Sequence, residues 1–522
     1  MRRTLPPDVS AETFAVALSG FSKIVGPEYL FTGSALESYL DPYAIVDPER
    51  YAPSAAVAPD DVEQIQKILK IANDHRIPLW TISTGKNLAY GGPAPRLPGS
   101  MILDLKRMNR ILDVNEEFGY ALVEPGVSYF ELFEYIREKG LKLWIDAPSP
   151  GWGSVLANAL ERGGGHTPYG DHFGMQCGME VVLADGDVVR TGMGALPGNN
   201  TWQLFKYGFG PYLDGIFTQS NFGVVTKMGI WLMPEPPGYR PFMITFPREE
   251  DIEQIVEILR PLKINNVIHN AAVIAHMQFQ AAIQTAKSEY YTGDGPLPDS
   301  VARKIMDDQD IGMWNFYGAL YGPDLILDAH WEVIRDAFSA IPGTKFFLAD
   351  DRPDDPVMKY RIKGMSGVPN LSEFGFLNWR GNSAHIDFSP VSPTTGADAL
   401  KQYTMIRDRS IEYGFDYLGV FVIGWRALNH IVTLVFDKTD MDDKQRAHEL
   451  FGILIDEAAA EGYGEYRTHI SFMDQIAGTF NYNDNALMKL NETIKDALDP
   501  NGILAPGKQG IWPQYLRDKK ND

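Results

Sequence analysis

The clearest break in the chain is the segment Pro234–Gly238, which reads Pro-Glu-Pro-Pro-Gly. Proline fixes its own backbone and lacks an amide donor, so three prolines beside a glycine indicate a linker. The chain has 522 residues, which is too long for one hydrophobic core. We therefore expect at least two domains, with a boundary at this linker.

Before the linker, a helix, a strand and a glycine-rich loop follow one another. The segment 61–75 is predicted to be a helix because its apolar residues recur at helical spacing behind Asp61, in the N-cap position. An apolar strand at 79–82 leads into Thr81–Arg96, TISTGKNLAYGGPAPR. Its small hydroxyl residues and unhindered backbone amides suit a phosphate. Because neither a P-loop nor a G-x-G-x-x-G pattern is present, a plain structural turn is the commoner interpretation from the residues alone.

Two further elements are predicted in this half of the chain. Ser128 and Glu131 have the spacing of a capping box, which favours a helix at 128–139. Apolar residues alternate across 180–190 on both sides of Ala184–Asp187, which is typical of a β-hairpin.

After the linker, short apolar segments alternate with helical patterns. Strands are expected at 242–246, 313–321, 345–349, 385–389, 417–424 and 430–436, and helices at 249–259, 397–413 and 442–460. Strands that follow one another as neighbours favour an antiparallel sheet, covered by the helices on one face, in an α+β domain. The tail beyond residue 462 contains one more predicted helix, 485–498.

Composition argues against several classes of function. The formal net charge of −21 argues against nucleic acid or an anionic membrane as a partner. Cys177 is the only cysteine, and the ten histidines are scattered without an H-E-x-x-H pattern, so we expect no metal site. No apolar run approaches the ~20 residues of a membrane span. No secretion signal follows the two N-terminal arginines, so we expect a cytoplasmic protein.

Motifs spread along nearly the whole chain are shared with one family. They are STGKN-x2-YGG-x-APR at 83–96, EPGVSYFELFEYI at 124–136, PGWGSV at 150–155, TPYGDHF at 167–173, RTGMGALPG at 190–198, FTQSNFGVVTKMGIWLMPEPP at 217–237, HIDFSPVS at 385–392, GYGEYRTH at 462–469 and DPNGILAPGKQGIWP at 499–513. On these motifs the sequence resembles the vanillyl-alcohol oxidase / 4-cresol dehydrogenase flavoprotein family. Within that family it is most similar to the branch of bacterial eugenol oxidase and 4-alkylphenol oxidases.

The resemblance implies an α+β, two-domain FAD-binding fold of the vanillyl-alcohol oxidase type. Both chain ends, residues 1–238 and 465–522, would form the FAD-binding domain. Residues 239–464 would form a cap domain around an antiparallel sheet. The linker found from composition lies at the same boundary.

The resemblance also implies FAD as the cofactor, with its pyrophosphate on the loop 83–87. The residues expected to bind FAD are Ser83, Thr84, Gly85, Lys86, Asn87, Ser154, Asn158, Gly223 and Val225. His385 stands where the oxidase branch attaches its flavin covalently through the 8α-methyl carbon, whereas the cresol dehydrogenase branch uses a tyrosine. Without the resemblance, a lone histidine on a strand is more often a core or surface residue.

Substrates of this family are phenols with a para side chain, oxidised at the benzylic carbon. A phenolate is the better hydride donor, but phenols ionise only near pH ~10, so the site must stabilise the anion. By family position, Tyr90, Tyr466 and Arg467 would do so, and Asp146 would act beside the benzylic carbon as a base and an electrostatic partner. From the residues alone, the tyrosines and Arg467 would be read as packing or surface residues and Asp146 as a turn cap.

The predicted substrate pocket departs from the family pattern at several positions. Gly164 and His166 lie in RGGGH, where relatives carry RGVGY. Asp387 replaces a small residue and Val420 a glutamine of the eugenol-oxidising relatives, and Ser389 completes the predicted pocket. These departures favour a larger or oxygenated para substituent.

The resemblance predicts oxidation of 4-hydroxybenzyl alcohols, 4-alkylphenols and 4-allylphenols by hydride transfer to flavin N5 through a quinone methide, with O2 reoxidising the flavin and yielding H2O2. The alternative keeps these substrates but passes the electrons to a cytochrome or another protein acceptor. A flavin-binding protein without turnover is a third class, against which the four intact residues Tyr90, Asp146, Tyr466 and Arg467 argue. Family analogy alone suggests a homodimer or a larger homo-oligomer.

Overall fold

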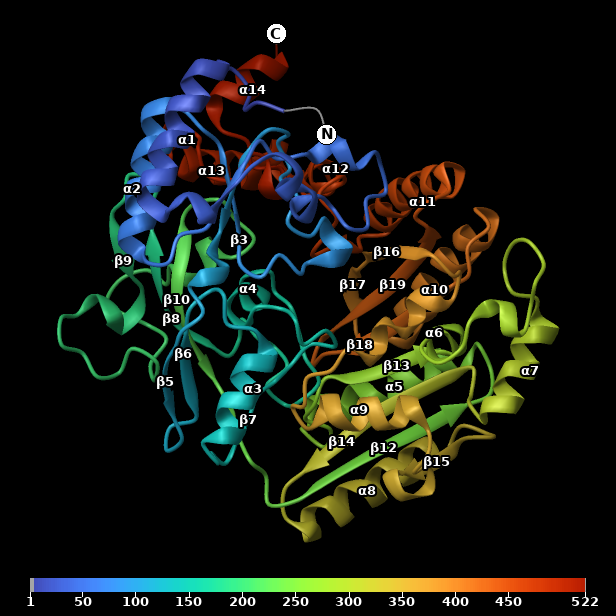
Figure 1. The fold of residues 1–522 in the computed structure, drawn as a ribbon. Coiled ribbons are helices and arrows are strands. Elements are labelled where there is room, and N and C mark those ends of the chain that lie inside the picture. Colours follow the sequence, from blue (N-terminus) through green and yellow to red (C-terminus); the bar gives the residue numbers. More distant parts are fainter. Residues whose placement is uncertain (1–3, 522) are drawn as a thin grey trace.

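The structure is a computed structural model that describes residues 4–521. Figure 1 shows two lobes, of which the first contains both ends of the chain and the second follows the linker. The C-terminal helices α12 (Met473–Thr479), α13 (Tyr482–Leu498) and α14 (Gln514–Asn521) lie in the same lobe as the N-terminal helices α1 (Ala11–Val25) and α2 (Val62–His75).

A small, mostly parallel sheet packs against α1 and α2. Its strands, in spatial order, are β1 (Leu30–Phe31), β2 (Ala56–Val57), β4 (Met101–Asp104) and β3 (Leu79–Ile82). The strands β2, β4 and β3 are parallel, and both helices bury their apolar residues in the core beside them. Helix α2 begins as predicted at Asp61, whose side chain accepts a hydrogen bond from the Gln64 amide at 2.8 Å.

An antiparallel sheet of five strands completes the framework of the first lobe. In spatial order they are β5 (Ile111–Asn115), β6 (Tyr120–Val123), β10 (Val224–Trp231), β8 (Gln176–Val182) and β9 (Val188–Arg190). Strands β8 and β9 form the predicted hairpin. Helices α3 (Tyr129–Glu138) and α4 (Val155–Leu160) pack on this sheet, and α3 opens with the predicted capping box of Ser128 and Glu131. A short pair, β7 (Leu143–Trp144) and β11 (Met233–Pro234), lies next to the linker.

The C-terminal segment is joined to the first lobe by main-chain hydrogen bonds. The Leu79 amide of β3 donates to the Ile503 carbonyl, and the Ala505 amide donates to the Leu79 carbonyl, both at 2.7 Å. The buried Lys495 Nζ, on α13, donates to the Asn221 carbonyl at 2.8 Å. Both ends of the chain therefore build the first lobe.

The second lobe is built on one sheet of nine strands. Its order is β15 (Lys345–Leu348), β12 (Tyr239–Phe246), β14 (Trp314–Tyr321), β13 (Ala272–His276), β18 (Gly419–Ile423), β19 (Ala427–Asp437), β17 (Pro390–Pro393) and β20 (Gly464–Glu465), with β16 (Ser383–Phe388) also paired to β19. All of these pairs are antiparallel. The predicted α+β class and the antiparallel cap sheet are confirmed.

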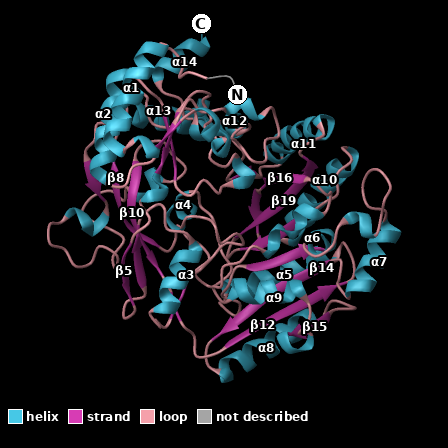
Figure 2. Cartoon of the chain, in the orientation of Figure 1, coloured by secondary structure: helices cyan, strands magenta, loops and turns pink. Residues whose placement is uncertain are grey.

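Helices cover both faces of this sheet, so the prediction of one covered face was wrong (Figure 2). One face carries α5 (Asp251–Ile264), α8 (Asp324–Phe338), α10 (Gly396–Glu412) and α11 (Met441–Ala460), and the other carries α6 (Met277–Ala282), α7 (Asp299–Gln309) and α9 (Pro356–Met365). Strand β14 shows the reason, since all of it is buried, with Phe316 in one core and Tyr317 in the other. A strand buried on both faces has no apolar alternation from which a second layer could be predicted.

Candidate active site

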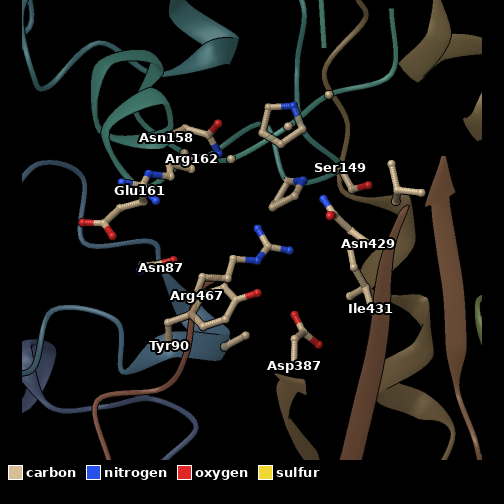
Figure 3. Close-up of a pocket in the computed structure, with 18 of the residues that line it drawn as sticks. Asn87, Tyr90, Ser149, Asn158, Glu161, Arg162, Asp387, Asn429, Ile431 and Arg467 are labelled. Atoms are coloured by element: carbon tan, nitrogen blue, oxygen red, sulfur yellow. The ribbon is translucent and has the colours of Figure 1, made fainter. Parts of the chain in front are cut away.

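A cavity of about 850 Å³ is lined by residues from both lobes. This volume is near the upper end of the ~300–1,000 Å³ usual for ligand sites. Figure 3 shows Asn87 and Tyr90 entering it from the first lobe, Asp387 and Ile431 from the sheet of the second, and Arg467 from the segment that follows β20. The cavity can therefore hold a large ligand that both lobes contact.

The loop after β3 forms one part of the cavity wall. All five of the residues 83–87 predicted to contact the pyrophosphate belong to that wall. Gly85 has a φ of +68°, a conformation that glycine adopts without strain. A Cβ on Gly91 would lie 2.8 Å from the Ile470 side chain, so the end of this loop packs closely against the C-terminal segment. Glycine is therefore required at residue 85 for the backbone conformation and at residue 91 for the packing against the C-terminal segment.

Ser154 and Asn158, the predicted cofactor residues near helix α4, also line the cavity. Ser154 is the N-cap of α4, and its Oγ accepts a hydrogen bond from the Ala157 amide at 3.1 Å. Gly223 and Val225 are not among the lining residues, and Val225 packs in the core of the five-stranded sheet. Contact of these two residues with a cofactor stays a prediction.

Asp146 lies directly behind the cavity wall. Its Oδ2 accepts hydrogen bonds from the Thr167 amide, at 2.7 Å, and from the Thr167 hydroxyl, and its Oδ1 lies 2.9 Å from His172 Nε2. Gly165 lines the cavity next to this carboxylate, and a Cβ there would be 1.3 Å from Asp146 Oδ1. The absence of a side chain at residue 165 therefore lets a fixed carboxylate come close to the cavity.

Arg467, Tyr90 and Tyr466 meet in one corner of the cavity. Figure 3 shows Arg467 next to Tyr90. The guanidinium carbon of Arg467 is 5.1 Å from the ring centre of Tyr90 and 4.9 Å from that of Tyr466. Tyr90 Oη and Arg467 Nε find no hydrogen-bond partner among residues 4–521. Buried donors of this kind are normally satisfied, so this corner is suited to an acceptor from outside the chain.

The charges in this corner suit an anionic oxygen. Burial raises the pKa of Tyr90 well above its usual value, although Arg467 acts in the opposite direction, and burial also raises the pKa of Tyr466. Burial opposes the charge of Arg467, but Tyr466, Tyr90 and Asp387 together raise its pKa. Two neutral phenol O–H donors thus stand beside a permanent cation, and all three can bind an oxyanion.

His385 lies on β16 and is buried in the wall of the same cavity. Its Nδ1 is 3.3 Å from Asp387 Oδ1, and the Thr433 hydroxyl donates to that same oxygen at 2.9 Å. Its Nε2 has no partner in the part of the chain that the structure describes. Burial lowers the pKa of His385, so the imidazole is neutral. When Nδ1 carries the proton toward Asp387, the lone pair of Nε2 is available.

The structure brings four of the five predicted substrate-pocket residues into the cavity wall. Gly164, His166, Asp387 and Val420 line it. Ser389 is fully buried outside the lining residues, and its Oγ has no hydrogen-bond partner within residues 4–521. Its role in the pocket stays a prediction.

Several polar residues of the wall were not predicted from the sequence. Arg361 on α9 and Glu373 come from a stretch between the quoted motifs of the resemblance, so the motifs could not select them. Glu161 and Lys508 also line the cavity and form an ion pair that joins α4's C-terminal end to the tail. This pair forms between residues far apart in the sequence and is visible only in the fold.

The residues present fit FAD. The cavity is large, the loop 83–87 with its glycine and two small hydroxyl residues forms part of its wall, and the buried Nε2 of His385 is unpaired among the described residues. Within residues 4–521, no group of three or more histidine, cysteine or acidic side chains is arranged to hold a metal ion. None of the helices in the described part of the chain combines the length and apolar character needed to cross a membrane.

Two family models match the chain. Residues 53–192 match the FAD binding domain, and residues 320–509 match the C-terminal domain of FAD linked oxidases. Over 511 residues the chain is 44% identical to the 4-cresol dehydrogenase [hydroxylating] flavoprotein subunit of Pseudomonas putida, with 97% of each chain covered.

Two solved structures match over almost the whole chain. The structure of p-cresol methylhydroxylase with bound substrate is 43% identical, with a TM-score of 0.96, and 98% of this chain and 99% of the other are covered. The isoeugenol complex of 4-ethylphenol oxidase from Gulosibacter chungangensis is also 43% identical, with a TM-score of 0.97 and coverage of 98% and 100%. The chain therefore belongs to the vanillyl-alcohol oxidase / 4-cresol dehydrogenase family of FAD-linked oxidoreductases.

Proposed function

We propose that this protein oxidises para-substituted phenols at the benzylic carbon, with FAD as its cofactor and O2 as the electron acceptor. The substrates would be 4-hydroxybenzyl alcohols, 4-alkylphenols and 4-allylphenols. The observation that carries this proposal is the corner where Arg467, Tyr90 and Tyr466 meet with unpaired donors. The relatives named for their activity on 4-cresol and 4-ethylphenol support the same class of substrate.

The corner would bind the phenol as its anion. A phenol has a pKa near ~10, and a permanent cation with two neutral O–H donors lowers the free energy of the phenolate relative to the phenol. Negative charge on the ring oxygen then promotes loss of hydride from the para side chain, which leaves a quinone methide. When bound, FAD supplies the hydride acceptor, and its reoxidation by O2 yields H2O2.

Asp146 would act on the side-chain end of the substrate. Its carboxylate can stabilise the electron-poor benzylic carbon electrostatically. It can also accept the proton of a benzylic alcohol or activate water for addition to the quinone methide. Thr167 and His172 fix the orientation of this carboxylate. Gly165 lies between it and the cavity and has no side chain to block the approach. A fixed orientation is what such a positioned base needs.

FAD would be held by the loop 83–87 and the start of α4, with His385 attached covalently to the flavin. The neutral imidazole and the unpaired Nε2 of His385 support this attachment. We also propose that residues 1–238 and 465–522 form the FAD-binding domain and residues 239–464 the cap. The nine-stranded sheet supports this division, since its strands run from β12 to β20.

A second candidate keeps the substrates but passes electrons to a protein acceptor. It is favoured by the 44% identity to a relative named as the flavoprotein subunit of a dehydrogenase. The acceptor is tested by mixing the protein with 4-ethylphenol or vanillyl alcohol without oxygen and then admitting air. Flavin bleaching with rapid recovery and H2O2 is the expected result, whereas bleaching with slow recovery would favour the dehydrogenase. Absence of bleaching with both compounds would contradict the proposed substrate class.

The same experiment on Arg467→Ala tests the phenolate corner. Removal of the cation should slow anaerobic bleaching by roughly 10²–10³-fold, as for loss of one preorganised group that stabilises an oxyanion. The bound-flavin spectrum should persist. Arg137→Ala, on the exposed face of α3, removes an arginine outside the cavity and is the matched control. Bleaching of Arg467→Ala at the wild-type rate would contradict the role of Arg467.

A further inference from the structure

The cavity contains a second polar cluster, made by Arg361, Glu373, Ser149 and His166. In Figure 3, Ser149 lies across the open space from Tyr90. The Ser149 hydroxyl donates to Glu373 Oε2 at 2.7 Å and lies 3.2 Å from His166 Nε2. These contacts join Ser149, His166 and Glu373 to one another, and none of them involves a residue of the corner that would bind the phenolate.

Arg361 is the unusual member of the cluster. It is only 3% exposed, yet its guanidinium makes no hydrogen bond within residues 4–521, and Nε and Nη2 are buried without a partner. Glu373 Oε2 lies 3.8 Å from Nη1, beyond hydrogen-bond distance. The rings of Tyr360 and Tyr317 lie 4.6 and 5.4 Å from the guanidinium carbon. A buried cation without hydrogen bonds is costly, so the protein's own groups leave Arg361 incompletely satisfied.

Helix α9 holds Arg361 in place against the cavity. The Tyr239 hydroxyl donates to the Ile362 carbonyl at 2.8 Å, and the Tyr321 hydroxyl donates to the Met365 carbonyl at 2.7 Å. Both tyrosines belong to strands of the nine-stranded sheet. The guanidinium is therefore positioned by a helix that is fixed at its C-terminal end, as a preorganised binding group would be.

Glu373 supplies the acceptor of the cluster. Its Oε2 accepts hydrogen bonds from Ser149, at 2.7 Å, and from the Tyr360 hydroxyl, at 2.9 Å. Its side chain is 25% exposed, and it belongs to the cavity wall. Burial, reinforced by Arg361, lowers the pKa of His166, so that histidine is neutral. The cluster thus combines one cation, one anion and a neutral histidine.

This charge balance selects a neutral polar group over an acid. A carboxylate ligand beside His166 would be repelled by Glu373 and Asp146, since the charges of both carboxylates act on that histidine. A hydroxyl can accept from Arg361 and donate to Glu373 at the same time. A purely apolar chain would fill the space but leave Arg361 buried without a hydrogen bond, which disfavours it.

We propose that Arg361 and Glu373 form a subsite for a hydroxyl group on the para side chain, beyond the benzylic carbon. The preferred substrates would then be 4-(hydroxyalkyl)phenols. This inference rests on the proposed function, since it requires the phenol oxygen to be bound at Arg467. Arg361 and Glu373 are specificity-determining residues in this proposal and take no part in the chemical step.

The test compares substrates that differ only in a terminal hydroxyl or methyl group. The pairs are 4-(2-hydroxyethyl)phenol with 4-propylphenol, and 4-(3-hydroxypropyl)phenol with 4-butylphenol. For each pair, the ratio of kcat/KM is measured within one preparation, so any loss of folded or flavin-containing protein cancels. The wild-type protein should prefer the hydroxyl member of at least one pair.

Arg361→Met keeps a long side chain but removes the donors, and Glu373→Gln keeps its size but removes the charge. In Arg361→Met the preference for the hydroxyl should fall by about 10- to 100-fold, the effect of losing one hydrogen bond to a charged group. Glu373→Gln should change the ratio in the same direction. Lys359→Met, an exposed position on the same helix, should leave the ratio unchanged.

Two results would overturn the subsite. One is a wild-type preference for the methyl member of both pairs, and the other is a ratio that neither Arg361→Met nor Glu373→Gln changes. Turnover of 4-methylphenol, which has no distal group, separates this failure from that of the proposed function. If 4-methylphenol is oxidised and the ratios do not respond, only the subsite is wrong. If no phenol is oxidised, both the subsite and the proposed function are wrong.

Discussion

Gly165 determines how closely Asp146 can approach the cavity. A Cβ at this position would lie 1.3 Å from Asp146 Oδ1 and 2.9 Å from His172 Nε2. Separations below about 3 Å from these fixed atoms are not tolerated, so one side would have to move. The His172 ring is itself held by the Tyr129 hydroxyl, 3.1 Å from Nδ1, which leaves little room to adjust.

We therefore predict that Gly165→Ala displaces Asp146 and impairs turnover more than flavin binding. Overpacking at a buried site costs roughly 1–3 kcal/mol of stability, and a displaced base should lower kcat more strongly than KM changes. Steady-state kinetics and the bound-flavin spectrum would measure both effects. Gly164→Ala is the matched control. It should lose less activity than Gly165→Ala, because its Cβ would contact only the Gly170 carbonyl, at 3.2 Å. Wild-type kcat in Gly165→Ala would contradict the argument.

Among the secondary-structure elements, the buried strands of the second lobe carry two histidines. His276 ends β13, and His430 lies on β19, where its Nε2 is 2.5 Å from the Tyr417 hydroxyl. Burial lowers the pKa of each to about 3. An unfolded histidine has a pKa near ~6.5, so below that pH the unfolded chain binds protons that the folded chain excludes.

These two histidines should therefore leave the free energy of unfolding unaffected above pH ~6.5 and lower it as the pH drops below that value. Each of the two histidines contributes a loss of about 1.4 kcal/mol per pH unit between ~6.5 and ~3. His430→Gln retains a polar partner for Tyr417 but has no titrating group. It should therefore reduce the slope of the unfolding free energy against pH by the contribution of one histidine. Denaturant unfolding between pH 6.5 and 4.5 would measure this. An equal slope in wild type and variant would contradict the assignment of His430 as a buried neutral group.

The elements differ in how far the sequence could predict them. Helix α2 and the capping box at Ser128 follow from local patterns, and both are found where expected. Helix α9 was missed because it lies between the sheet and the cavity, and six of its ten residues, Arg361 among them, are buried. A helix buried on two sides shows no apolar stripe. The same burial hides Arg361, whereas Tyr90, Arg467 and His385 lie in family motifs and could be named in advance.

In the molecule as a whole, the cavity is lined by residues of both lobes. The loop 83–87 belongs to the first lobe and β16 to the second, and residues of both line the cavity. A ligand that binds only the folded form stabilises it in proportion to RT ln(1 + [L]/Kd), about 2.7 kcal/mol at 100 Kd. Because FAD would contact both lobes, it should stabilise them together.

We predict that removal of the flavin lowers the unfolding temperature and loosens both lobes. His385→Ala would give protein from which the flavin can be dialysed away if the attachment is covalent in the wild type. Added FAD should then raise the unfolding temperature in a concentration-dependent manner. Hydrogen exchange should slow at 83–87 and at 383–388 alike. Protection confined to the first lobe would contradict a cofactor that bridges the two.

The position of Lys508 and Gln509 in the cavity wall has a consequence for biosynthesis. Both residues lie near the C-terminal end of a chain of 522 residues. Because a ribosome releases the chain from its N-terminus onward, the loop 83–87 and the nine-stranded sheet emerge long before this last part of the wall exists. The cavity would therefore not close fully around FAD until residues 508 and 509 have emerged and packed against the rest of the wall.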